Sequence, residues 1–125
     1  MSRTIEIGNA LVSLCREGKG ELALDTLYDE GIVSVEAEGS DALPARMEGI
    51  AAVRGKNEWW VGNHEVHAST ADGPYVGADP NRFAVAFEID VTPRATGERQ
   101  TMREIGIYTV AGGRIVHEEF WSRRD

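Results

Sequence analysis

The residues after position 82 alternate between hydrophobic and polar side chains in the manner of β-strands. Residues 83–91 alternate with a period of two, and after a turn at 93–97 the pattern returns over residues 101–110. A Gly-Gly pair then turns the chain into a last strand that reaches Trp121. The pattern therefore predicts an antiparallel meander of three strands.

Three segments before the meander carry helical spacing instead. The first covers residues 5–17, and the second runs from residue 21 through Tyr28 until Gly31 closes it. The third covers residues 50–64, and Trp60 is expected on its inward face. The inward stripe of this third helix consists of Ile50, Val53, Asn57, Trp60, Val61 and His64.

The remaining segments predict short strands and loops. Residues 32–36 are β-branched and alternate, which favours a strand after the second helix. Residues 39–45 are small, polar and contain a proline, so we expect a loop that could fold over an opening as a lid. Residues 65–70 are expected to start the sheet, and a break is predicted at 72–74. The predicted order of elements is ααβαββββ.

The register of the first hairpin of the meander follows from charge. A two-residue turn sets Glu88 opposite Arg103, which is an attractive pair, whereas a three-residue turn sets Glu88 opposite Glu104, which is a repulsive one. The attractive register places Glu104 opposite Phe87, on the hydrophobic face of the sheet. A carboxylate on such a face has a raised pKa and marks a pocket more often than a plain core.

The same register can be carried through the Gly-Gly turn into the last strand. It then predicts that one hydrophobic and aromatic face holds the cross-strand pairs Glu104–Trp121, Gly106–Glu119 and Tyr108–His117. On the opposite face we expect a partly hydrophobic surface that no helix covers, made of Ala84, Ala86, Ile105, Ile107, Val116 and Phe120 with Glu88, Asp90, Arg103 and Glu118.

Composition and charge narrow the class of protein. A chain of 125 residues, 42% hydrophobic and 27% charged, is expected to form one domain over residues 1–125. A net charge of −8 makes nucleic acid an unexpected partner. No hydrophobic run approaches the roughly 18 residues of a membrane span, so no membrane association is expected. Because Cys15 is the single cysteine and the amino terminus lacks a secretory pattern, we expect a cytoplasmic protein.

The sequence holds no motif for a metal or a nucleotide cofactor. His64 and His67 straddle the predicted end of the third helix, lack the spacing of two ligands on one helical turn, and have no third ligand nearby. Phosphate-binding and dinucleotide-binding glycine motifs are both missing. We therefore predict neither a metal nor a cofactor.

The element order and two short motifs resemble the nuclear transport factor 2-like superfamily, and within it the SnoaL-like domains. The motifs are Glu48-Gly49-Ile50 at the start of the third helix and the final strand Gly-Arg-Ile-Val-His-Glu-Glu-Phe-Trp over residues 113–121. The resemblance implies an α+β cone, in which a cystatin-like curved antiparallel sheet wraps three N-terminal helices and leaves a cavity. It also implies pairing of two copies through the outer face of the sheet.

Cavity enzymes that this chain resembles use one carboxylate or histidine to move a proton, and a second polar group to stabilise the oxyanion that forms. Glu104 is the first candidate for the acid or base, and Glu119 is the second. The candidate ligand-binding residues are Trp60, Tyr108, His117, Trp121, Phe87 and Tyr28. Tyr28 is the nearest substitute for the helix-one tyrosine of ketosteroid isomerases, which this chain lacks.

Two functions remain open on the sequence. In the first, the cone binds a small hydrophobic or aromatic molecule and carries out proton-transfer chemistry of the isomerase, cyclase or dehydratase type. In the second, the domain is a non-catalytic ligand-binding or dimerisation module, and Glu104 forms a structural ion pair with Arg46 or Arg54. The two differ in whether the cone holds an open pocket with an unpaired acid.

Overall fold

The structure, a computed structural model, describes residues 3–123 and has the α+β order ααββαββββ. The sheet order is β2-β1-β6-β5-β4-β3. The helices are α1 (Arg3–Arg16), α2 (Gly20–Thr26) and α3 (Ile50–Asn63), and the strands are β1 (Tyr28–Val35), β2 (Arg46–Glu48), β3 (His64–Val76), β4 (Arg82–Pro93), β5 (Gln100–Ala111) and β6 (Arg114–Ser122).

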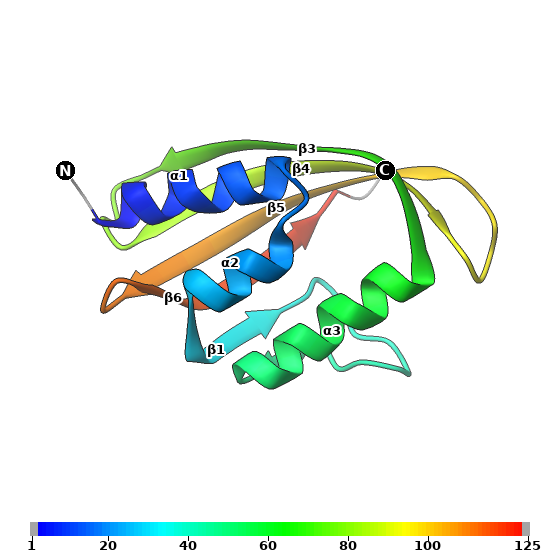
Figure 1. The fold of residues 1–125 in the computed structure, drawn as a ribbon, viewed down its shortest axis with the longest axis horizontal. Coiled ribbons are helices and arrows are strands. Elements are labelled where there is room, and N and C mark those ends of the chain that lie inside the picture. Colours follow the sequence, from blue (N-terminus) through cyan, green and yellow to red (C-terminus); the bar gives the residue numbers. More distant parts are fainter. Residues whose placement is uncertain (1–2, 124–125) are drawn as a thin grey trace.

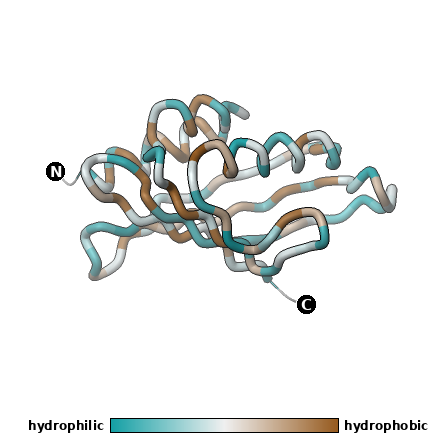
Figure 2. Tube along the Cα trace, turned by 90° about the horizontal axis from the view of Figure 1, so that it is seen from below, coloured by the Kyte–Doolittle hydropathy of each residue, from teal (hydrophilic) through white to brown (hydrophobic). Residues whose placement is uncertain are grey.

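All three helices lie on one side of the curved sheet. Helix α1 runs along β3 and β4, whereas α3 lies beside β1 and leads directly into β3 (Figure 1). The main core fills the space between α1, α2 and the middle strands, with Leu11, Ile32, Phe83 and Ile115 almost fully buried. Hydrophobic stretches follow the helices and strands, while the loops at the ends are mainly hydrophilic (Figure 2). This confirms the predicted α+β fold.

The second helix is shorter than the sequence pattern predicts. Helix α2 ends at Thr26, and Tyr28 is the first residue of β1, paired with Ile115 of β6. Strand β1 is parallel to β6, so the sheet is not wholly antiparallel. The side chain of Tyr28 is buried in the core, and this burial outweighs the helical spacing that placed it on α2.

Strand β3 continues through the predicted break at 72–74. The pairing with β4 shifts between Asp72 and Tyr75 and then resumes. Gly73 has φ of 149°, and a Cβ there would lie 2.9 Å from the carbonyl oxygen of Ala84. A glycine is therefore required where the bulged strand approaches β4, and the segment bends the strand without ending it.

The predicted register of the first hairpin is confirmed. Glu88 pairs with Arg103 and Phe87 pairs with Glu104 across β4 and β5. Arg103 Nε lies 3.5 Å from an Oε atom of Glu88 on the outer face. Glu104 therefore lies on the inner face of the sheet, which is the face that the helices cover.

The predicted register of the second hairpin is wrong by one residue over most of its length. The pairs next to the turn, Ala111–Arg114 and Val110–Ile115, have the predicted spacing, but the next pair is Thr109–His117. One extra residue, Val116, therefore forms a bulge in β6. Because strand side chains alternate, a single extra residue exchanges the two faces for the rest of the strand.

The bulge reverses the predicted orientation of every later residue of β6. Glu104 pairs with Ser122, Gly106 with Phe120 and Tyr108 with Glu118. Consequently Glu118 and Phe120 lie on the inner face, where the sequence predicted Glu119 and Trp121. His117, Glu119 and Trp121 lie on the outer face, and Trp121 is 58% exposed there.

The structure also bears on the predictions for Cys15 and for a membrane span. Cys15 packs against the core cluster, and burial, with a smaller contribution from Glu118, raises the pKa of its thiol to about 11. This agrees with the interpretation of Cys15 as a small core residue. Within residues 3–123, no helix has the length and hydrophobicity needed to cross a membrane.

Candidate functional site

An open pocket of about 530 Å³ lies between α3, the segment after β1 and the inner face of the sheet. Glu104, Met102 and Ile89 come from the sheet, and Lys56, Asn57 and Trp60 come from α3. Ser40, Leu43 and Pro44 of the predicted lid loop also line the pocket. The pocket therefore lies where the sequence placed the opening of the cone.

Glu104 brings an unpaired carboxyl group into this pocket from the middle of β5. Among residues 3–123, no other side chain forms a hydrogen bond or an ion pair with it. Burial, followed by the negative charge of Glu36, raises the pKa of Glu104 to about 7, although Lys56 opposes the rise. Near neutral pH both its protonated and its ionised forms are populated, so Glu104 can give or take a proton.

The structural alternative for Glu104 is not supported. Arg46 pairs with Glu48 at the surface, and Arg54 pairs with Glu21 and Asp25. Neither arginine therefore neutralises Glu104, and the predicted ion pair with either of them is wrong.

A second carboxyl group, Glu118, is buried behind the pocket. Its side chain accepts hydrogen bonds from the hydroxyl groups of Tyr28 and Ser34, the latter at 2.7 Å. Only 3% of Glu118 is exposed, and burial raises its pKa, while Lys56 and the two hydroxyl groups act in the opposite direction. Every oxygen of this carboxylate has a partner, which makes Glu118 a fixed part of the interior.

Lys56 joins this buried group to the pocket. Its Nζ donates to Oγ of Ser34 at 2.6 Å and to Oε1 of Glu36 at 2.9 Å. Oε2 of Glu118 lies 3.8 Å from Nζ, within ion-pair distance but beyond a hydrogen bond. Lys56 also lies 5.3 Å from the ring centroid of Phe120 and is itself 8% exposed.

Aromatic side chains form one wall of the pocket. Trp60 stacks on His64, with ring centroids 4.3 Å apart, and Nδ1 of His64 donates to the carbonyl oxygen of Trp60 at 2.7 Å. Trp59 and Phe120 also line the pocket. A flat wall of this kind suits a ring-shaped ligand.

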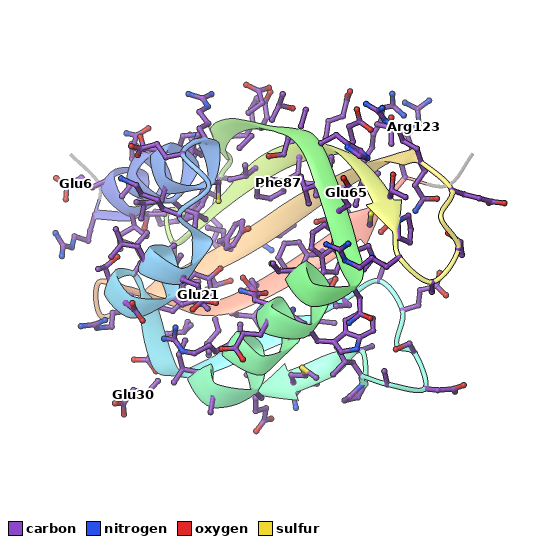
Figure 3. All side chains as sticks on the ribbon, turned by 45° about the vertical axis from the view of Figure 1, so that its right-hand side comes forward. Glu6, Glu21, Glu30, Glu65, Phe87 and Arg123 are labelled. Carbon is purple, nitrogen blue, oxygen red and sulfur yellow. The ribbon has the colours of Figure 1, made fainter. Side chains whose placement is uncertain are left out.

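Three other predicted ligand residues lie below the pocket, inside the core. Tyr108 is 2% exposed, stacks on Phe83 at 5.0 Å and covers Gly106, where a Cβ would lie 2.8 Å from the tyrosine ring. Phe87 packs against the core cluster, and Figure 3 shows it inside the curve of the sheet. The hydroxyl group of Tyr28 donates a hydrogen bond to the buried carboxylate of Glu118. Trp60 and Glu104 are thus the predicted site residues that line the pocket.

The residues that could bind a metal do not form a cluster. Within residues 3–123 no three histidine, cysteine or carboxylate side chains lie close enough to hold an ion. His64 is bonded to Trp60, and the ring of His67 is 2.7 Å from the hydroxyl of Thr92.

Comparison with known proteins identifies the family. The model of the SnoaL-like domain matches residues 2–122. The chain belongs to the SnoaL-like family. A crystal structure of a candidate SnoaL-like polyketide cyclase from Mesorhizobium loti is 43% identical, with a TM-score of 0.85 and coverage of 93% of this chain and 96% of that one. No curated protein matches the chain in sequence.

More distant solved structures share the SnoaL-like fold. A protein of unknown function with a cystatin-like fold from Xanthomonas campestris is 16% identical, with a TM-score of 0.77 and coverage of 99% of this chain and 92% of that one. The Δ5-3-ketosteroid isomerase from a Mycobacterium species is 18% identical, with a TM-score of 0.68 and coverage of 97% and 93%. At these identities the likeness concerns the fold alone.

Sequence reasoning missed two polar residues, Lys56 in this SnoaL-like pocket and Glu118 behind it. Lys56 lies three residues after Val53 and four before Trp60, so it belongs to the inward stripe of α3, and helical spacing could have found it. Val61, which was expected inward, is 66% exposed. Glu118 had no signal in the sequence, because only the bulge at Val116 turns it inward.

Proposed function

We propose that this protein binds a small hydrophobic or aromatic molecule in the pocket and moves a proton on it, with Glu104 as the acid or base. The reaction would be of the isomerase, cyclase or dehydratase type. The observation that carries the proposal is an unpaired carboxyl group with a pKa of about 7 in an open pocket. A group with this pKa is half ionised at neutral pH, which is the optimum for proton transfer.

Two further observations support the proposal. The pocket lining also includes hydrophobic and aromatic side chains, among them Trp59, Trp60 and Phe120. Such a lining favours a ligand that contains a ring. A relative that is 43% identical is named as a candidate SnoaL-like polyketide cyclase, and a more distant relative of the same fold is a ketosteroid isomerase.

The proposal predicts that the protein catalyses hydrogen exchange at acidic carbon atoms. In deuterium oxide, a panel of cyclic ketones and aromatic β-diketones is incubated with the protein, and loss of the C–H signal is followed by NMR. At least one compound should exchange faster with the protein than without it. Glu104→Gln should lower that rate at least about a hundredfold, because glutamine can neither accept nor return the proton.

The control for this experiment is Glu98→Gln, which makes the same change in an exposed loop and should leave the exchange rate unchanged. The wild-type rate should rise with pH as Glu104 ionises around pH 7. Binding of the panel without any exchange that depends on Glu104 would contradict the enzymatic proposal. The non-catalytic ligand-binding module would then be the better description.

We also propose that two copies pair through the outer face of the sheet. The outer patch is made of Tyr75, Ala84, Ala86, Ile105, Ile107 and Trp121, and each of these residues lines one or both of two further pockets of about 250 and 570 Å³. Tyr75, Ile105 and Trp121 are exposed, and the helices cover the other side of the sheet. Exposed hydrophobic side chains grouped on a sheet face that no helix covers are typical of an interface. The bulge in β6 adds Trp121 to this patch and removes Phe120 from it.

Ile107→Asp should convert the dimer into a monomer, because it places a charge at the centre of the outer patch. Size-exclusion chromatography with light scattering gives the mass directly. Val61→Asp is the matched control, since Val61 is an exposed hydrophobic residue on α3, away from the patch. A wild-type monomer, or a dimer that survives Ile107→Asp, would contradict the interface.

A further inference from the structure

Lys56 is a charged group in the pocket that the proton transfer by Glu104 does not use. An ammonium group has three N–H donors, and those of Lys56 supply Ser34 and Glu36. Because Glu118 is too distant at 3.8 Å to accept a full hydrogen bond, one donor is left over. Lys56 lines the same pocket as Glu104, so a bound molecule can approach its ammonium group.

We infer that Lys56 is the oxyanion-binding residue of the pocket, and that the substrate class is an enolisable carbonyl compound with a hydrophobic or aromatic body. The inference rests on the proposed function, in which Glu104 is the acid or base. It adds Lys56 as the polar group that stabilises the oxyanion. The carbonyl oxygen of the substrate accepts the third N–H of Lys56, and the ring lies against the wall formed by Trp59 and Trp60. The acidic carbon then faces Glu104.

The chemistry balances without any further reactant. The ionised Glu104 removes a proton from the carbon next to the carbonyl group, and the electron pair of that C–H bond forms a carbon–carbon double bond. The π electrons of the carbonyl group move to its oxygen, which becomes an enolate oxygen held by Lys56. In a substrate with a further carbon–carbon double bond next to the acidic carbon, the enolate electrons re-form the carbonyl group and shift that double bond into conjugation. Protonated Glu104 then gives its proton to the far carbon of the former double bond, which yields the conjugated isomer.

The charges around Lys56 fit this role. Glu36 and Glu118 both lie within 4 Å and keep the ammonium fixed in position, while Ser34 locks its direction. Lys56 and Glu104 line the same pocket, and the positive charge of Lys56 opposes the rise in the pKa of Glu104. His64 also lines the pocket, but its Nδ1 is engaged with the carbonyl oxygen of Trp60. Lys56 is thus the positive group placed to meet an enolate.

A bound phenol tests the oxyanion site, because a phenolate resembles an enolate and para-nitrophenol changes colour when it ionises. The measurement is made in Glu104→Gln protein, so that no carboxyl group in position 104 contributes. The pKa of the bound phenol is read from its absorbance during a pH titration. Adding Lys56→Met should raise this pKa by about one unit, a tenfold change in the ratio of phenolate to phenol.

Two control variants test whether the change in the pKa of the bound phenol is specific to Lys56. Lys19→Met removes an exposed lysine that pairs with Glu17 at the surface, and it should leave the pKa of the bound phenol unchanged. Glu36→Gln removes a negative charge beside Lys56 and should lower that pKa, the opposite direction to Lys56→Met. A lysine whose ammonium group lay far from the phenol oxygen would leave the pKa of the bound phenol unchanged in Lys56→Met.

The Lys56→Met protein could be unstable, because it leaves Glu118 without a cation. In that case Lys56→Met is combined with Glu118→Gln and compared with Glu118→Gln alone, both in the Glu104→Gln background. Equal phenol pKa values with and without Lys56, or no binding of para-nitrophenol to the Glu104→Gln protein, overturn the inference. Neither result bears on whether Glu104 drives hydrogen exchange, which is measured separately.

Discussion

Glu104→Gln is expected to make the protein more stable above about pH 8, by about 3 kcal/mol, and to leave its stability unchanged below about pH 4.5. The reason is the rise of the pKa of Glu104 from 4.5 in an unfolded chain to about 7 in the pocket. The pocket therefore favours the protonated carboxyl group. Glutamine has a similar shape and needs no proton to remain neutral.

The sign follows from proton binding. Below the unfolded pKa, both states are protonated and Glu104 carries no penalty. As the pH rises through the window from 4.5 to about 7, the unfolded chain has released its proton while the folded protein still holds it. Stability therefore falls across this window and stays reduced at higher pH, where the folded state must bury an ionised group.

Urea unfolding of the wild type and of Glu104→Gln at a series of pH values measures the difference directly. Glu98→Gln serves as the control, because Glu98 lies in the exposed turn between β4 and β5. Its curve should follow that of the wild type. A Glu104→Gln protein that is less stable than the wild type at high pH would show that the carboxylate has a stabilising partner. That result would remove the basis for Glu104 as the proposed acid or base. The expected result, a gain in stability when a functional group is removed, is common at active sites.

Glu118→Ala should destabilise the protein by about 3–5 kcal/mol, the largest loss expected from a single polar residue here. The change leaves the hydroxyl groups of Tyr28 and Ser34 without their acceptor and removes a carboxylate from beside Lys56. All of these groups are buried, so water cannot replace the lost contacts. The free energy of unfolding from urea titration measures the effect.

The adjacent residue provides a matched control. Glu119 lies on the outer face, where its carboxylate accepts a hydrogen bond from Nε1 of Trp121 at 2.7 Å. Glu119→Ala should cost no more than about 1 kcal/mol. If Glu119→Ala cost more than Glu118→Ala, the register of β6 would be the one without the bulge, and the buried network would be wrong.

The local sequence pattern was sufficient for most of the fold. The spacing of hydrophobic residues gave α1, α3 and the three strands of the meander, because such periodicities reflect which face of an element is buried. The register of β4 and β5 followed from the charges of Glu88, Arg103 and Glu104, which are close enough across one hairpin to decide it. This register placed Glu104 on the inner face, and the pocket around it agrees.

At Tyr28, long-range packing and not the local sequence pattern determines the secondary structure. Its spacing fits the end of a helix, but its hydroxyl group reaches Glu118, which lies 90 residues later in the chain. The parallel pairing of β1 with β6 is equally distant in sequence. Neither contact leaves a periodic signal, because it depends on segments that meet after folding.

The sequence by itself determined the α+β fold, the family and the position of Glu104 in the pocket, because these depend on short-range periodicity, on a hairpin and on motifs. Only the tertiary structure decided which acids and aromatic residues of β6 face inward. A single bulged residue, Val116, exchanges Glu119 and Trp121 for Glu118 and Phe120. Side chains on a strand alternate between the two faces of the sheet. One extra residue therefore moves every later side chain of the strand to the opposite face.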